Sequence, residues 1–174
     1  MGKSVTITPA TNDDAEQVLK LQYLCYQAEA ALYGDYRIPP LTETLDELRA
    51  EFGRGAAVVA RLGEEVVGAV RGTVEENGTA VIGRLIVHPR LQGHGLGARL
   101  LLAMEARLAE GGAQVKRYQL FTGHRSEANL RLYRRLGYEP VGTERVSARL
   151  SLVTLEKAPL DGAPSAVSSA TTAR

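Results

Sequence analysis

The feature that most constrains this chain is a glycine-rich turn between a predicted strand and a predicted helix. The residues run Gln92-Gly93-His94-Gly95-Leu96-Gly97, after an extended apolar segment that ends at Val87, and an apolar stripe of helical period begins at Leu96. The N–H groups and the dipole at a helix N-terminus favour an anion, and glycines let the backbone approach it closely and adopt positive φ. The turn therefore predicts a site for a phosphate or pyrophosphate.

Two other pyrophosphate sites can be compared with this turn. Gly93-x-Gly95-x-x-Ala98 also satisfies the fingerprint of dinucleotide-binding folds. Such a site needs an Asp or Glu at the end of the next strand to hold the ribose, but that strand ends Leu120-Phe121-Thr122-Gly123-His124. No Gly-Lys-Ser/Thr follows the turn, which argues against a P-loop. The turn is therefore predicted to bind a pyrophosphate-bearing cofactor other than a dinucleotide or a P-loop nucleotide.

Composition indicates one domain without a strongly charged partner. The chain has 174 residues, of which 44% are hydrophobic and 24% charged. Its 21 basic and 20 acidic residues leave a formal net charge of +1, so neither nucleic acid nor a membrane surface is the expected partner. A single cysteine, Cys25, and three scattered histidines predict no disulfide and no metal site. Without a signal-like or membrane-spanning apolar run, a cytoplasmic location is predicted.

The order of the predicted elements indicates an α/β (α+β) protein. Turn residues and β-rich segments predict an antiparallel meander over 56–87, and a strong helix is predicted over 96–110. With a strand predicted over 115–121, this helix completes a βαβ unit, because parallel strands need a crossover connection. The remaining strands are predicted at 5–8, at about 138–146 and at about 148–156. Three further helices are predicted: one over 12–31, one that starts at about 42, and one that starts at 126 or 127 and ends before 137. The tail, 158–174, is rich in small and polar residues and is predicted to be disordered.

Two motifs in register resemble those of a known family. The run Val87-x-Pro89-x-x-Gln92-Gly93-x-Gly95-x-Gly97-x-x-Leu100-Leu101 is similar to the Q/R-x-x-G-x-G/A motif of the GNAT superfamily of N-acetyltransferases. Downstream, Asn129-x-x-x-Tyr133-x-x-x-Gly137-Tyr138 resembles the second acyl-CoA motif of that family. The resemblance implies a GNAT domain over 1–157, with a mixed, mostly antiparallel twisted sheet of about six to seven strands, a central parallel βαβ pair and about four helices. It also implies acetyl-CoA as the acyl donor.

The resemblance carries over specific roles to the matching residues. The pantetheine arm is expected to lie between the two strands of the βαβ unit, with the Val87 N–H polarising the thioester carbonyl. Tyr133 is the implied general acid for the departing CoA thiolate, and Asn129, four residues earlier on the same helix face, is implied to bind the pantetheine. Simple packing of Tyr133 beneath Leu136 is the alternative. The implied cofactor-binding residues are Leu85, Ile86, Val87, Gln92, Gly93, His94, Gly95, Leu96, Gly97, Ala98, Asn129 and Tyr133.

The general base is where this sequence departs from the family pattern. Many relatives carry a Glu on the strand before the glycine turn, and Arg84 stands at the matching position. A guanidinium cannot act as a base at neutral pH. The amine proton could instead be removed by a water chain, by His124 or by Glu144, or the amine could already be neutral when it binds.

Arg84 suggests a role toward the acceptor instead. Strand alternation places it on the same face as Ile82 and Ile86. The hypothesis is that Arg84, together with Arg71 on the neighbouring strand, binds a carboxylate or phosphate of the acceptor through bidentate hydrogen bonds. The alternative is an arginine that reaches into solvent or pairs with Glu75.

The segment between the first two predicted helices is a further candidate for the acceptor site. Tyr33 and Tyr36 lie in this proline-stiffened connection and are predicted either to bind substrate or to pack over the helix joint. The predicted function is an acetyl-CoA-dependent N-acetyltransferase that acts on a primary amine of a small molecule or peptide by direct attack in a ternary complex. A non-catalytic acyl-CoA-binding regulatory module and a protein N-acetyltransferase are the alternatives. The sequence leaves open the acceptor, the acyl length and the oligomeric state, and the resemblance makes a homodimer one of the expected assemblies.

Overall fold

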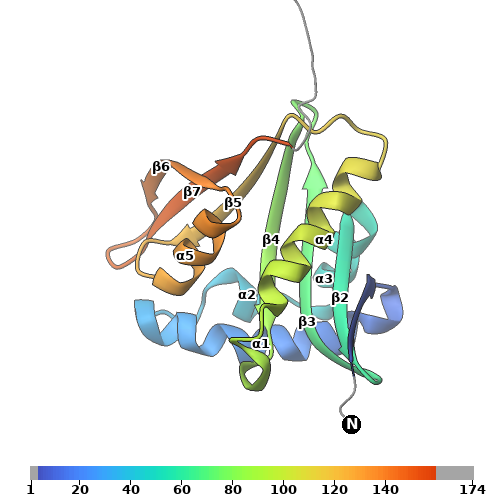
Figure 1. The fold of residues 1–174 in the computed structure, drawn as a ribbon. Helices are drawn as coiled ribbons and strands as arrows, with labels where there is room; N and C mark the ends of the chain where they lie inside the picture. The colour runs from blue at the N-terminus through green and yellow to red at the C-terminus, as the bar shows by residue number, and fades with distance from the viewer. Residues whose placement is uncertain (1–3, 160–174) are drawn as a thin grey trace, which may run out of the picture.

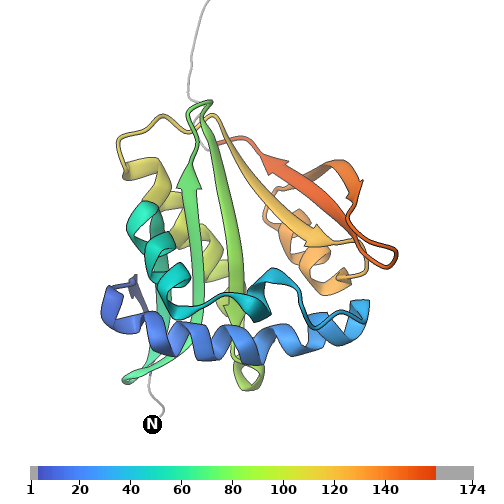
Figure 2. The same ribbon diagram turned by 180° about the vertical axis from the view of Figure 1, so that it is seen from behind.

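The computed structural model describes residues 4–159, which form a single seven-stranded sheet with helices on both faces (Figures 1 and 2). The strands are β1 (Val5–Pro9), β2 (Ala56–Leu62), β3 (Glu65–Val74), β4 (Thr79–Val87), β5 (Arg117–Gly123), β6 (Glu139–Arg145) and β7 (Ser151–Lys157). The α-helices are α1 (Ala15–Tyr33), α2 (Pro39–Thr42), α3 (Leu45–Arg54), α4 (Leu96–Glu110) and α5 (Glu127–Arg135), and short 3-10 turns occupy Asn12–Asp14 and Pro89–Leu91. The tail predicted to be disordered is 158–174, and of it only 158 and 159 are among the described residues.

The predicted mixed sheet with a central parallel pair is confirmed. The strand order is β1-β2-β3-β4-β5-β7-β6, and β4 and β5 are the parallel neighbours, joined through α4. The described residues contain five α-helices where about four were expected. The additional one is the single turn α2, which starts at Pro39 and Pro40 within the segment predicted to interrupt the helices. Proline is tolerated in the first turn of a helix because the N–H it lacks has no helical partner there.

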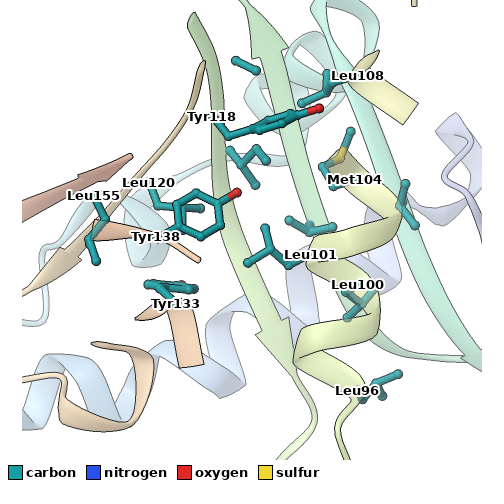
Figure 3. Packing of buried hydrophobic residues seen from close by; sticks show 14 of the residues in the cluster. Leu96, Leu100, Leu101, Met104, Leu108, Tyr118, Leu120, Tyr133, Tyr138 and Leu155 are labelled. Carbon is teal, nitrogen blue, oxygen red and sulfur yellow. The ribbon is translucent and has the colours of Figure 1, made fainter. Parts of the chain in front are cut away.

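Each face of the sheet has its own buried core. On one face α4 packs with Leu100, Leu101 and Met104, all 0% exposed, and Figure 3 shows these side chains directed from α4 toward the sheet. On the other face α1 and α3 cover a second cluster that includes Leu48 and Val59. None of the helices in residues 4–159 is long and apolar enough to cross a membrane. The cytoplasmic location stays a prediction.

The sheet opens between its two central strands. β4 and β5 are paired only at Thr79–Val81 and Arg117–Gln119, although both strands continue well beyond these residues. Past that short ladder the two strands diverge, as Figures 1 and 2 show from opposite sides. In both views α1 crosses the open end of the resulting V, and its C-terminal part lies beside α5. The expected gap between the strands of the βαβ unit is therefore present.

A β-bulge in β4 changes which way the later residues of this strand point. Ala69 pairs with Ile86 and Arg71 with Gly83, so Val70 stands opposite two residues of β4 rather than one. Arg84 occupies the left-handed region with φ 53°, a conformation that is uncommon for a residue other than glycine. The prediction that Ile82 and Ile86 share a face with Arg84 is wrong for Ile82, which packs in the α4 core while Ile86 packs under α1. Simple alternation fails here because the extra residue reverses the direction of the strand's side chains.

A buried carboxylate closes the narrow end of the V. Glu105 on α4 is 5% exposed and accepts hydrogen bonds from the Tyr138 hydroxyl at 2.6 Å and from Lys157 Nζ at 2.9 Å. The Tyr118 hydroxyl donates to the Glu105 carbonyl oxygen at 3.1 Å. Burial, followed by the hydrogen bond to Glu105, raises the pKa of Tyr138, so this phenol stays protonated. Glu105 thus ties α4 to β5, to the start of β6 and to the end of β7.

Replacing Glu105 by Ala is expected to lower the free energy of unfolding by about 3–5 kcal/mol, because it leaves the buried Lys157 ammonium without a counter-ion. Urea denaturation followed by far-UV circular dichroism measures this change. Glu110→Ala, at the exposed end of the same helix, is the matched control and should stay within about 0.5 kcal/mol of the parent protein. Equal losses for the two variants would contradict the proposed importance of the Glu105 contacts.

Candidate functional site

A cleft of about 540 Å³ lies where β4 and β5 diverge. Its walls come from four parts of the chain: the C-terminal half of α1, the end of β4, the glycine turn with the start of α4, and α5. Its lining residues are Cys25, Tyr26, Ala28, Glu29, Leu85, Ile86, Val87, Leu91, Gln92, Gly93, Gly95, Leu96, Gly97, Ala98, Ala128, Asn129, Leu132 and Arg135. The cleft is therefore built around the glycine-rich turn at residues 92–97.

The glycine turn has the backbone conformation that its sequence predicts. Gly93 and Gly95 have φ of 86° and 77°, and Gly95 is the N-cap of α4. A Cβ atom on either glycine would meet nothing within 4 Å, so the positive φ and not crowding by the protein selects glycine here. The Gln92 side chain turns back and donates to the Val87 carbonyl oxygen at 3.2 Å. The open side of the turn, at a helix N-terminus, suits an anionic ligand.

The structure brings nearly all of the predicted cofactor-binding residues together. Of the twelve, only His94 and Tyr133 do not line the cleft. His94 is exposed in the turn and is not among the residues that line the cleft. Asn129 lines the cleft from α5, and its Nδ2 donates to the Thr122 hydroxyl at 3.3 Å. The binding role of these residues stays a prediction.

Tyr133 lies deeper than the helix-face argument suggested. It is 5% exposed and belongs to the buried cluster on the α4 side, where its ring is 6.2 Å from that of Tyr138 (Figure 3). Burial first, and then the nearby Tyr26 and Glu29, raise the pKa of Tyr133, so the phenol remains protonated at neutral pH. Tyr133 is therefore packed in the core beside Tyr138, and its phenol keeps a proton near two cleft residues, Tyr26 and Glu29.

The contribution of α1 was not found from the sequence. Cys25, Tyr26, Ala28 and Glu29 form one wall of the cleft, and Cys25 Sγ donates to the Val87 carbonyl oxygen at 3.3 Å. Burial raises the pKa of Cys25 to about 11, so it stays a thiol at neutral pH. The available signal was the apolar stripe of the first helix, which runs through Cys25 and Ala28. Arg135, at the last turn of α5, was also missed as a cation of the cleft.

A second polar cluster lies on the α1–α3 face, beside the bulge. Arg71 Nη2 donates to Glu43 Oε2 at 2.8 Å, and Gln22 Nε2 donates to Glu43 Oε1 at 2.9 Å. Burial alone would raise the pKa of Glu43, but these hydrogen bonds outweigh it and the net shift is downward, so Glu43 is an anion. Arg84 Nε is 4.0 Å from Glu43, which is too far for a hydrogen bond, and the Arg84 side chain makes no hydrogen bond within residues 4–159.

The two guanidinium groups of this cluster share one carboxylate. Burial, together with the charge of Arg71, lowers the pKa of Arg84, although the group stays charged. Arg71 Nη1 and Arg84 Nε are buried without a hydrogen-bond partner in the described chain. Both arginines also line a small hollow of about 150 Å³, next to Gly83 and Glu51. The predicted proximity of Arg84 and Arg71 is confirmed by this geometry, and the predicted pairing with Glu75 is not what the structure shows.

The remaining candidates lie apart from the cleft lining. Tyr33 is the last residue of α1 and 3% exposed, with its hydroxyl bonded to Ser126 and to the Arg125 N–H, so it packs rather than forming an open lip. Tyr36 is 58% exposed in the following turn. His124 is exposed, and its Nδ1 accepts from the Ser151 N–H at 3.0 Å. Glu144 is exposed on β6. In residues 4–159 no group of three His, Cys, Asp or Glu side chains could hold a metal ion.

Comparison with known proteins gives a family match and a set of structural neighbours. The model of the "Acetyltransferase (GNAT) family" matches residues 16–138. No curated protein matches the sequence significantly. The structure is similar to that of yncA from Salmonella typhimurium with its cofactor acetyl-CoA (TM-score 0.74, 18% identity, 92% of this chain and 96% of that chain). It is also similar to the PaiA N-acetyltransferase of Thermoplasma acidophilum in complex with coenzyme A (TM-score 0.73, 17% identity, 89% of this chain and 99% of that chain). A third is the ribosomal-protein-S18-alanine N-acetyltransferase of Escherichia coli (TM-score 0.73, 16% identity, 90% of this chain and 94% of that chain).

Replacing Gly95 by Ala is expected to weaken binding of acetyl-CoA at least about tenfold, because a side chain in the left-handed region costs about 1–2 kcal/mol and displaces the turn. Isothermal titration calorimetry measures the affinity. Gly112→Ala is the matched control, since Gly112 also has positive φ (93°) and open space around its Cβ but does not line the cleft. If both variants bind acetyl-CoA as the parent does, the turn is not the site of its pyrophosphate.

Proposed function

Because the chain belongs to the acetyltransferase (GNAT) family, we propose that it moves the acetyl group of acetyl-CoA to a primary amine of a small molecule or peptide, by direct attack in a ternary complex. The observation that carries this proposal is the cleft between β4 and β5, with the glycine turn at one end and Asn129 across from Val87. An elongated ligand that has an anionic part and an amide-rich arm matches this shape. The structures with acetyl-CoA and coenzyme A among the neighbours support the choice of donor.

The donor is proposed to lie along the diverging strands. The N–H groups of residues 92–98 bind its pyrophosphate, with the α4 dipole adding to the attraction. Its pantetheine arm pairs with the backbone of 85–87 in place of the missing β5 partner, and Asn129 binds it from α5. The thioester carbonyl then accepts the Val87 N–H, a dipole that is fixed before negative charge develops on the oxygen.

Tyr133 is proposed to supply the proton for the leaving group. The amine nitrogen attacks the carbonyl carbon, the C–S bond breaks, and the sulfur gains negative charge. The raised pKa of Tyr133 ensures that the phenol holds its proton until this charge appears, and the growing thiolate is the base that receives it. The same burial makes Tyr133 a weak acid, so the proton moves late, when the C–S bond is largely broken.

Tyr133→Phe keeps the packing and removes the hydroxyl, so kcat is expected to fall about 100-fold while the KM for acetyl-CoA changes little. Release of CoA thiol in the presence of a panel of primary amines measures the rate. Tyr118→Phe is the control, because it removes a hydroxyl from the same buried cluster on the side facing Glu105. An unchanged kcat in Tyr133→Phe leaves packing as the role of this residue.

The acceptor is proposed to carry an anionic group that binds Arg84. Two guanidinium groups share the single carboxylate of Glu43, which leaves one positive charge of this cluster without a counter-ion. A half-buried guanidinium without hydrogen bonds costs free energy unless a ligand pairs with it. The adjoining hollow, which both arginines line, has room for a carboxylate. Acceptors with a carboxylate next to the amine, such as amino acids, fit this arrangement.

Matched amines test this acceptor class. The ratio of kcat/KM for phenylalanine to that for 2-phenylethylamine, which lacks the carboxylate, is expected to fall about 10-fold or more in Arg84→Ala, because a hydrogen bond to a charged group is worth about 1.5–3 kcal/mol. Arg49→Ala, exposed on α3, is the control and should keep the parent ratio. An unchanged ratio in Arg84→Ala would remove the carboxylate from the proposal.

The alternatives are separated by the same assay. A regulatory module would be stabilised by acetyl-CoA in a thermal shift measurement but would release no CoA with any amine. A protein acetyltransferase would release CoA with peptides that bear a free N-terminus or lysine, and not with the small amines. An enzyme is the function supported by the glycine turn and Asn129, which line the cleft, and by Tyr133, whose buried phenol stays protonated near Tyr26 and Glu29 of the cleft wall.

A further inference from the structure

The cleft contains one carboxylate, which no motif of the sequence singled out. Glu29 lies in α1, near its C-terminal end, and is half-buried in the cleft wall. It is the only Asp or Glu among the residues that line this cleft. A carboxylate can accept a proton from an attacking amine, which is the function that Arg84 cannot perform at the usual position of the family base.

A directed chain of hydrogen bonds holds this carboxylate. The Arg125 N–H donates to the Tyr33 hydroxyl at 3.0 Å, the Tyr33 and Ser126 hydroxyls are 2.9 Å apart, and Ser126 Oγ donates to Glu29 Oε2 at 3.0 Å. The direction is fixed by the two ends, because a backbone N–H can only donate and a carboxylate can only accept. Ser126 therefore gives its proton to Glu29 and receives that of Tyr33. The bond fixes one oxygen of Glu29, while Oε1 accepts no hydrogen bond from residues 4–159.

The backbone of the β5–α5 connection is shaped to admit this chain. A Cβ atom on Gly123 would lie 2.0 Å from the Tyr33 hydroxyl oxygen, so only glycine at this position lets Tyr33 reach Ser126. Tyr33 was predicted to contact substrate directly. Its buried position suits an indirect role, in which it orients Ser126 and through it Glu29.

Helix geometry places Glu29 close to the reacting atoms of the proposed reaction. Cys25, four residues earlier on the same face of α1, contacts the carbonyl oxygen of Val87. Side chains at i and i+4 are about 5–6 Å apart at their Cβ atoms, so Glu29 stands one helical turn from Cys25, the α1 residue that contacts Val87. The charge of Glu29 also contributes to the raised pKa of both Tyr26 and Tyr133, which places the carboxylate near the proposed proton donor.

We propose that Glu29 is the general base of the acetyl transfer, with Ser126 and Tyr33 as its positioning residues. The assignment rests on the proposed function. The amine nitrogen forms a bond to the carbonyl carbon and loses a proton to Glu29 Oε1, while the C–S bond breaks and its electron pair goes to sulfur. The sulfur takes the proton of Tyr133, and the proton on Glu29 then returns to the Tyr133 oxygen. The net change is one amine proton moved to the CoA thiol.

Other ionisable groups share the neighbourhood of Glu29 and must be considered in any pH profile. They are Cys25 and Tyr26 on α1, Tyr133 and Arg135 on α5, and His124 and Arg125 in the connection before α5. Cys25, Tyr26 and Tyr133 have raised pKa values and stay protonated at neutral pH.

Glu29→Gln and Glu29→Ala test the assignment with the amine panel described above, phenylalanine and 2-phenylethylamine included. Both variants should bind acetyl-CoA with the parent affinity by calorimetry, which shows that they fold, and kcat should fall at least about 100-fold with little change in KM. In the parent protein, kcat/KM is expected to fall at acid pH as the base gains a proton. Glu29→Gln should not show this fall. Added formate should restore part of the activity of Glu29→Ala, because it can occupy the vacated space and accept the proton, an effect that a merely structural role would not produce.

Controls separate this assignment from the function it rests on. Glu16→Gln, exposed on the same helix, should keep the parent rate. If the parent protein turns over amines and Glu29→Gln does so equally well, Glu29 is not the base. If the parent protein releases no CoA with any amine of the panel, the proposed function is overturned and the assignment with it. A large loss of kcat in Glu29→Ala without any formate rescue, together with a parent-like pH profile in Glu29→Gln, would also overturn it.

Discussion

The short parallel ladder between β4 and β5 is the constraint on which the rest of this structure depends. Only the first residues of the two strands pair, while β4 is completed by β3 and β5 by β7 on their outer edges. Beyond the ladder, each strand keeps an inner edge of N–H and C=O groups without a strand partner, and such groups need another hydrogen-bonding partner when water is excluded. The Glu105 contacts with Tyr138 and Lys157 hold the narrow end together and so let the other end stay open. The cleft is thus a consequence of sheet geometry more than of any single side chain.

The bulge at Arg84 has a second effect on the site. By adding one residue to β4, it turns Ile86 toward α1 and Leu85 and Val87 toward the α4 face, and it directs the Arg84 guanidinium toward Glu43. The backbone of a residue other than glycine is held at positive φ there, a strain that the flanking ladder must overcome. Strain of this kind is most often found at functional positions, and here it lies at Arg84 of the proposed acceptor cluster, next to Leu85 of the proposed donor cleft.

Helix α1 connects these two regions. Gln22 reaches the Glu43–Arg71 pair, and further along the same helix Cys25 and Glu29 form part of the cleft wall. Its last residue, Tyr33, is tied to the β5–α5 connection through Ser126. The helix therefore spans the open end of the V and links the two halves of the sheet, as Figures 1 and 2 show. The groups proposed for the acceptor, for the donor and for proton transfer are consequently brought together by one helix.

The sequence by itself determined what depends on local patterns. The order of elements, the parallel βαβ unit and the glycine turn follow from hydrophobic period, turn residues and the conformational freedom of glycine, all of which act between near neighbours in the chain. The proposed cofactor residues of the turn and Asn129 could be named because two local motifs resemble those of the GNAT family. Only the tertiary structure decided the contacts between distant segments. It made α1 a wall of the cleft and buried Tyr133 in the core. It also formed the hydrogen bonds from Tyr33 through Ser126 to Glu29, which join residues more than ninety positions apart in the sequence. The bulge belongs to this second group, because one extra residue in a strand is invisible to alternation until its partner strand fixes the register.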